Sequence, residues 1–251
     1  RSNEGLDQIL ARIDPDRPDR SVDSIFRMLD YGHQSIADMA PVAIFIDGIT
    51  AWLAWYVWSL CPLAGGQESS TRYIRMDPGG LPDPGVLGLP ASLHREWRQA
   101  MATAFDCYEA LLRGWSRLGE AAPARMRLPE PPPGLDAQRA ARQQARMLRN
   151  YAFDRARYLL PAAVHTNMML VMSARSWAEL CRHLASHRLP EAQRLSRALR
   201  DELALGAPRL LKHATPAPGL QQALTEQFAC WSRLARRSAT TAIADDAAPA
   251  E

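Results

Sequence analysis

The segment Glu68-Ser-Ser-Thr-Arg72-Tyr73 holds the residues best suited to chemistry in this 251-residue chain. Small hydroxyl residues let the backbone approach a ligand, and their N–H and O–H groups donate to phosphate oxygens. Arg72 adds a planar cationic fork that can hold a phosphate or carboxylate through two hydrogen bonds. The pattern indicates an anion site with Glu68, Ser70 and Arg72, although a polar loop before a turn has the same composition.

A second arginine, Arg157, stands in Ala156-Arg-Tyr-Leu-Leu-Pro161, on the last turn of an expected helix. There it can point into a cleft and neutralise an anion. The alternative is that it interacts favourably with the negative end of the helix dipole.

Two further positions have weaker local signals. His33 follows Gly32 and is either a general base, a flavin or phosphate contact, or a structural histidine in a turn. Ser173-Ala-Arg175 is followed one turn later by Glu179, and an Arg–Glu pair four residues apart on a helix is the simplest interpretation.

The cysteines are widely separated and form neither a CxxC pair nor a Cys/His cluster, so they predict no zinc site and no secreted disulfide framework. Reduced thiols in the cytoplasm are the simplest interpretation. Cys61 is also an alternative nucleophile, but it follows a helix end, whereas helix N-termini are what activate thiolates. The four cysteines are Cys61, Cys107, Cys181 and Cys230.

Composition narrows the class of protein. Hydrophobic residues make up 47% and charged residues 23%, which is typical of a globular protein, and a net charge of +3 is too small to indicate nucleic-acid binding. The apolar stretch 40–63 is broken by Asp47-Gly48 and predicts a buried strand followed by a helix, not a membrane span. There is no G-x-G-x-x-G motif, no P-loop and no internal repeat.

These patterns predict an α+β fold with a small central sheet and long packed helices. We expect a single domain over residues 1–237 and a disordered Ala/Thr/Asp tail over 238–251. The expected strand is Pro41–Ile49. The expected helices are Ser21–Tyr31, Ala51–Leu60, Ser92–Leu118, Asp136–Leu160, Thr166–His187, Pro190–Leu205 and Pro218–Arg237.

Taken in order, the motifs resemble the flavin-dependent thymidylate synthases, also called thymidylate synthase complementing proteins. Tyr31-Gly-His-Gln-Ser35 is similar to the family's Gly-His-Glu-Ser/Thr turn, and Gln67-Glu-Ser-Ser-Thr-Arg-Tyr73 to its Asn-Glu-x-Ser-x-Arg-Tyr segment. Downstream come the counterparts of Ala-Arg-x-x-Leu-Pro, Thr, Asn-x-Arg and Ala-Gln. The resemblance covers residues 21–205.

The resemblance implies a homotetramer with FAD bound where subunits meet. The family reaction transfers a methylene group from methylene-tetrahydrofolate to dUMP, with NADPH reducing the flavin. Carried over by position, Ser70, Arg72 and Arg157 hold the pyrimidine nucleotide, with Glu68 beside them. The implied cofactor-binding positions are His33, Ser35, Asp38, Arg175 and Glu179; no catalytic residue and no metal site is implied.

The chain departs from the family pattern on its flavin side. Leu60-Cys61-Pro62 stands where the family has Arg-His-Arg, whose side chains touch flavin and nucleotide, and Ser173 stands where it has Asn. Two functions therefore remain open: an active flavin-dependent methyltransferase acting on a dUMP-like nucleotide, or a non-catalytic homologue. The latter would be a partner subunit, one half of a duplicated protein or a ligand-binding module.

Overall fold

A computed structural model describes residues 4–17, 20, 23, 27, 34–130, 132–206, 208–211 and 214–246. The chain forms two compact units, and each is assembled from separate stretches of sequence. Unit 1 comprises Arg1–Val42, Val171–Arg188 and Ala192–Glu251, and unit 2 comprises Ala43–Leu170 and Leu189–Glu191. A single domain through residue 237 stays a prediction.

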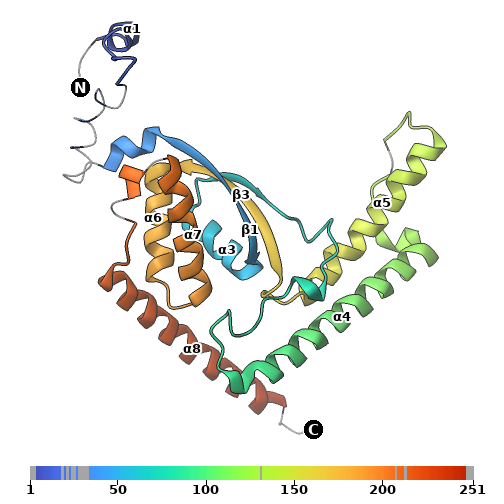
Figure 1. Cartoon of the computed structure of the whole chain (residues 1–251). Coiled ribbons are helices and arrows are strands. Elements are labelled where there is room, and N and C mark those ends of the chain that lie inside the picture. The colour runs from blue at the N-terminus through green and yellow to red at the C-terminus, as the bar shows by residue number, and fades with distance from the viewer. Residues whose placement is uncertain are drawn as a thin grey trace. The chain divides into compact units, whose positions relative to one another are not determined.

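Three antiparallel strands form the only sheet in the described part of the chain, in the order β1-β3-β2 (Figure 1). They are β1 (Pro41–Thr50), β2 (Gly65–Glu68) and β3 (His165–Ser173). A small sheet among long helices confirms the predicted α+β class. Strand β1 matches the predicted strand within one residue, while β2 lies in a segment for which no strand was predicted.

Strand β3 corrects the prediction of one helix over Thr166–His187: only Ala174–Ser186 is helical, as α6. Side chains alternate along β3, so that Thr166, Met168, Leu170 and Met172 are buried. This period of two belongs to a strand. Met and Leu favour helices locally, but hydrogen bonding to strands on both sides outweighs that preference.

The helix α3 (Ala51–Leu60) has the predicted bounds. The Thr50 side chain caps it by accepting a hydrogen bond from the Leu53 N–H at 3.1 Å. Leu53 and Val57 are completely buried, but Trp55 is 62% exposed, so the helix is covered on one side only, although its sequence is apolar all round.

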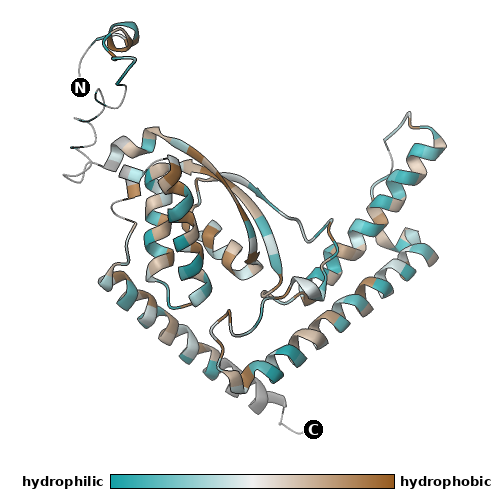
Figure 2. Cartoon of the chain, viewed as in Figure 1, coloured by the Kyte–Doolittle hydropathy of each residue, from teal (hydrophilic) through white to brown (hydrophobic). Residues whose placement is uncertain are grey.

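A helical hairpin of α4 (His94–Ala121) and α5 (Ala137–Ala156) forms much of unit 2 (Figure 1). Phe105 and Tyr108 of α4 pack with Ala156 in a buried cluster. Figure 2 shows that hydrophilic residues dominate α5, in keeping with its many arginines. Both helices were predicted, and Asp136 caps α5 through the Arg139 N–H at 2.8 Å.

Unit 1 centres on α6 and α7 (Pro190–Gly206). Trp177 is fully buried and its ring N–H donates to the Val42 carbonyl at 3.0 Å. The Ser196 hydroxyl donates to the Cys181 carbonyl at 2.7 Å and ties α7 to α6.

The remaining helices are short, apart from α8 (Pro218–Asp246), which runs beyond the predicted end at residue 237. Residues 247–251 of the expected tail, and most of the expected helix Ser21–Tyr31, lie outside the described residues. The short helices are α1 (Leu6–Leu10), η1 (Gln34–Met39), η2 (Pro78–Gly80), η3 (Ala91–Leu93), η4 (Pro123–Met126), η5 (Arg157–Leu159) and η6 (Pro208–Leu211).

Candidate functional site

Arg72 and Arg157 converge in unit 2 on one carboxylate. The Nε of Arg72 lies 2.9 Å from Oδ1 of Asp154, and the Nε of Arg157 lies 3.4 Å from the same oxygen. Arg157 also donates from Nη1 to the Thr71 hydroxyl at 3.5 Å. We call Thr71, Arg72, Asp154 and Arg157 the arginine cluster. Two cationic forks beside a hydroxyl form a potential anion site.

The arginine cluster is held by two separate elements. Arg72 lies in the turn after β2, where the Ser70 hydroxyl accepts from the Arg72 backbone N–H at 3.3 Å. Asp154 is on the last turn of α5 and Arg157 opens η5. Residues three apart on a helix are neighbours on its surface, so the helix end brings these two side chains together. The turn places the first arginine and the helix end places the second.

Polar atoms of the arginine cluster are buried without ideal partners. Oδ1 of Asp154 and Nε of Arg157 have no aligned hydrogen bond among the described residues, although their charges are close. Their contact is therefore an ion pair by distance and not a directed hydrogen bond.

Large side chains border the arginine cluster. The guanidinium of Arg157 lies over the Tyr158 ring at 5.3 Å, and the residue Tyr158 is 76% exposed. Tyr73, next to Arg72, is 64% exposed. These rings provide flat apolar surface on which a nucleotide base could lie.

Glu68 ends β2, and its carboxylate accepts hydrogen bonds from the Trp58 ring N–H at 3.2 Å and the Thr166 hydroxyl at 3.4 Å. The residue as a whole is exposed, but burial of its carboxylate end raises its pKa, and the two hydrogen bonds only partly offset this. Its recorded partners are thus Trp58 and Thr166, not the arginines.

Asp38, Ser173 and Arg175 meet in unit 1. Asp38 accepts from the Ser173 hydroxyl at 3.1 Å and from Nη1 of Arg175 at 2.9 Å. Ser173 also caps α6 by accepting from the Ser176 N–H at 3.2 Å. The structure thus brings together two of the predicted cofactor-binding residues, Asp38 and Arg175, and pairs them with each other.

This arrangement corrects the expected pair of Arg175 with Glu179. Glu179 instead pairs with Arg182 and, at 3.3 Å, with His183, and the Arg182 contact lowers the pKa of Glu179. Ser35 is exposed in η1, and His33 lies outside the described residues. Among the described contacts, none joins Ser35 or Glu179 to the pair formed by Asp38 and Arg175.

The segment Leu60-Cys61-Pro62 begins with the last residue of α3 and offers no charged or hydroxyl side chain. Cys61 is buried, and burial raises the pKa of its thiol to about 11. The thiol therefore stays protonated at neutral pH, which argues against Cys61 as a nucleophile.

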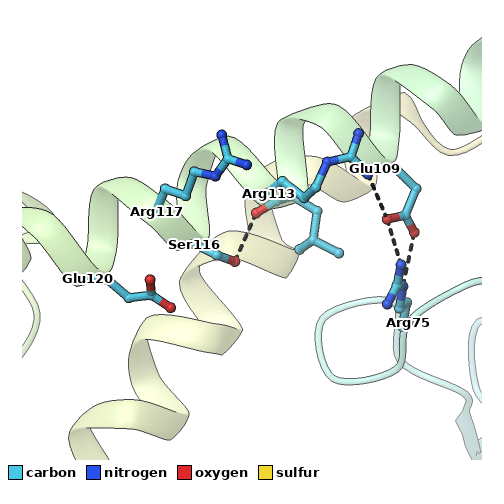
Figure 3. A pocket seen from close by; sticks show the side chains of 7 residues that line it. Arg75, Glu109, Arg113, Ser116, Arg117 and Glu120 are labelled. Atoms are coloured by element: carbon cyan, nitrogen blue, oxygen red, sulfur yellow. Dashed lines mark hydrogen bonds and ion pairs between the residues drawn. The ribbon is translucent and has the colours of Figure 1, made fainter.

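A shallow pocket lies along α4, where Arg75 binds Glu109 through two hydrogen bonds of 2.9 and 2.6 Å (Figure 3). Arg113, also in this pocket, lies 3.7 Å from the same glutamate. Positive and negative charges alternate along it, so it resembles a solvated helix face more than a site for one ligand.

The residues that the structure describes support neither a metal site nor a membrane-spanning helix. They contain no group of three or more His, Cys, Asp or Glu side chains arranged to hold a metal ion. Nor does any helix among them combine the length and apolar character needed to cross a membrane.

Sequence reasoning missed Thr71 and Asp154. Asp154 stands three residues before Arg157, and this spacing on a helix was the signal that could have identified a partner. Local sequence cannot show that Arg72 shares the same carboxylate, because Arg72 is 82 residues away along the chain.

Comparisons with known proteins bear on the family and on the fold. The family model described as thymidylate synthase complementing protein matches residues 2–209. The UPF0159 protein Ta1429 of Thermoplasma acidophilum is 25% identical over an alignment of 209 residues that covers 76% of this chain and 41% of that protein. This chain therefore spans about two fifths of that relative's length.

Among solved structures, a similar one is the flavin dependent thymidylate synthase ThyX from Helicobacter pylori, complexed with FAD and dUMP. The TM-score is 0.51 at 17% identity, and the match covers 78% of this chain and 84% of that chain. This likeness establishes a shared fold.

Proposed function

Since the chain belongs to the thymidylate synthase complementing protein family, we propose that its arginine cluster binds the phosphate of a pyrimidine nucleotide such as dUMP. The observation that supports this most directly is the convergence of Arg72 and Arg157 on Asp154. Two guanidinium groups that share one carboxylate keep a net positive charge, which suits a phosphate monoester. The related Helicobacter pylori enzyme was crystallised with dUMP.

Each neighbouring residue has a distinct place in this proposal. The Ser70 and Thr71 hydroxyls would donate to phosphate oxygens, as hydroxyls in phosphate-binding turns do. Glu68 stays at the end of β2, where its partners Trp58 and Thr166 fix its position. It would contact the uncharged part of the nucleotide, since its own negative charge disfavours the phosphate.

The residues at the flavin-side positions do not fit FAD. Leu60-Cys61-Pro62 lacks the charge and the donors that a pyrophosphate requires, and the Cys61 thiol is buried and neutral. Arg175 is already neutralised by Asp38. We therefore derive no flavin step from the residues of this chain, and the proposal is nucleotide binding by a thymidylate-synthase-like fold.

One observation favours a second candidate, a complete reductive methylation with FAD, NADPH and methylene-tetrahydrofolate. The structurally similar Helicobacter pylori enzyme is complexed with FAD as well as with dUMP. In that case a further segment or a homologous chain, for example within an oligomer, would supply the flavin-binding groups. The nucleotide would still be held by the arginine cluster.

Isothermal titration with dUMP and with deoxyuridine tests the proposal, because only dUMP carries the phosphate. We expect dUMP to bind and Arg157→Ala to weaken dUMP at least about tenfold, since a charged hydrogen-bonded pair contributes about 1.5–3 kcal/mol. Arg98→Ala is the matched control, because Arg98 pairs with Asp83 on an exposed surface. Equal binding of dUMP and deoxyuridine would contradict phosphate recognition.

The two candidates are separated by titrating the same preparation with FAD and following its absorbance. Nucleotide binding without FAD binding supports the first candidate. Tight FAD binding by this chain alone would contradict the conclusion that residues 60–62 leave the chain without the groups that bind FAD.

A further inference from the structure

We propose that Asp154 is a positioning residue, which holds the guanidinium groups of Arg72 and Arg157 together in readiness for an anion. This inference rests on the proposed function and deepens it. Its basis is that one atom, Oδ1 of Asp154, is the closest acidic contact of both arginines, at 2.9 and 3.4 Å.

The geometry leaves the arginines able to bind a ligand. Each guanidinium approaches Asp154 most closely through Nε, so its outer end, formed by the two Nη groups, faces away from the Nε edge. That outer end is a two-donor fork suited to phosphate. In the part of the chain that the structure describes, the hydrogen bond from these outer ends is a long one of 3.5 Å, from Nη1 of Arg157 to Thr71.

Electrostatics explains why a carboxylate is needed at this point. The two Nε atoms lie within about 6 Å of each other, because both contact the same oxygen. At this separation two positive charges repel, and Asp154 offsets the repulsion. Arg72 is the less enclosed partner, because it extends from a turn and its side chain is 52% exposed, compared with 28% for Arg157.

Without the negative charge of Asp154, Arg72 should therefore turn into solvent while Arg157 stays at the helix end. The opposite possibility is that Asp154 occupies the place of the phosphate and competes with it. The two readings predict opposite effects of removing the charge, so Asp154→Asn decides between them.

The first measurement is the dissociation constant of dUMP for Asp154→Asn. Positioning predicts that it rises at least tenfold and that adding Arg72→Ala to this variant causes little further loss. Asp106→Asn, which removes an exposed carboxylate of α4, is the matched control for net charge. Unchanged or tighter dUMP binding by Asp154→Asn would overturn the positioning role.

The second measurement needs no ligand. Phenylglyoxal should modify Arg72 faster in Asp154→Asn than in the unmodified chain, as mapped by peptide mass spectrometry. Equal rates in proteins with the same thermal unfolding midpoint would also overturn the inference. If the unmodified chain fails to bind dUMP, the proposed function is wrong, and the phenylglyoxal rates still test the role of Asp154.

Discussion

Thr50 and Glu191 are joined by two hydrogen bonds, although 141 residues separate them in the chain. The Thr50 backbone N–H donates to Oε1 of Glu191 and its hydroxyl donates to Oε2, both at 2.9 Å. Thr50 is only 2% exposed and also caps α3. A single threonine thus ends β1, caps α3 and binds Glu191, all within unit 2.

Replacing Glu191 by Ala should therefore destabilise the protein by about 2–4 kcal/mol, because it leaves a buried N–H and a hydroxyl without their charged acceptor. Urea unfolding followed by circular dichroism measures the change. Glu202→Ala, at an exposed position on the same helix, should change stability by less than about 0.5 kcal/mol. Similar losses in both variants would contradict the importance of the Thr50–Glu191 contact.

Gly66 in β2 leaves no room for a side chain. A Cβ there would lie 2.2 Å from the Met169 carbonyl oxygen and 2.9 Å from a methyl carbon of Leu170. Backbone atoms of a paired strand cannot yield easily, so Gly66→Ala should cost at least about 2 kcal/mol in the free energy of unfolding.

The adjacent Gly65 is the control for this prediction, because a Cβ at Gly65 meets nothing within 4 Å. Gly65→Ala should stay within about 1 kcal/mol of the unmodified chain. Chemical denaturation of both variants makes the comparison, and equal stabilities would show that β2 does not lie against β3 as described.

The raised pKa of Glu68 predicts a pH dependence of stability. Burial makes the folded state bind the proton more tightly than the unfolded state, whose carboxyl has a pKa near 4.5. The free energy of unfolding should therefore fall as the pH rises from about 4.5 through the higher folded pKa. Glu68→Gln removes this titration, so the unmodified chain should lose stability relative to the variant across that range.

Urea unfolding at a series of pH values between 4 and 8 measures this difference. Glu130→Gln, at an exposed position, controls for loss of one surface charge. A stability difference between the unmodified chain and Glu68→Gln that is constant with pH, or that changes in the opposite direction, would contradict the burial of the Glu68 carboxylate.

The thiols should fall into two classes of reactivity. Cys61 and Cys181 are buried, with pKa values raised to about 11 and about 12, whereas Cys107 and Cys230 are exposed. Iodoacetamide at pH 8 should label only the exposed pair in the folded protein, because the buried thiols are protonated and shielded. Intact-mass measurement counts the labels, and peptide analysis locates them. Rapid labelling of Cys61 would contradict its burial and would support a role as a nucleophile.

Much of the helical structure could be predicted because it is encoded locally. The sequence patterns predicted α3, α4, α5 and α7 close to their observed positions, and they predicted the start of α8 but not its end. Strand β3 could not be predicted in this way. Its Met- and Leu-rich sequence suits either state, and its partners β1 and β2 lie about 100 residues earlier in the chain.

The sequence by itself determined which charged groups this protein has and which of them stand on the predicted helices, since side-chain chemistry and helix propensity act over a few residues. It also determined the family, through the order of its motifs. Only the tertiary structure decided that Arg72 and Arg157 meet at Asp154, and that Arg175 pairs with Asp38 and not with Glu179. The physical reason is that charges interact according to their distance in space, and chain folding sets that distance for groups far apart in sequence.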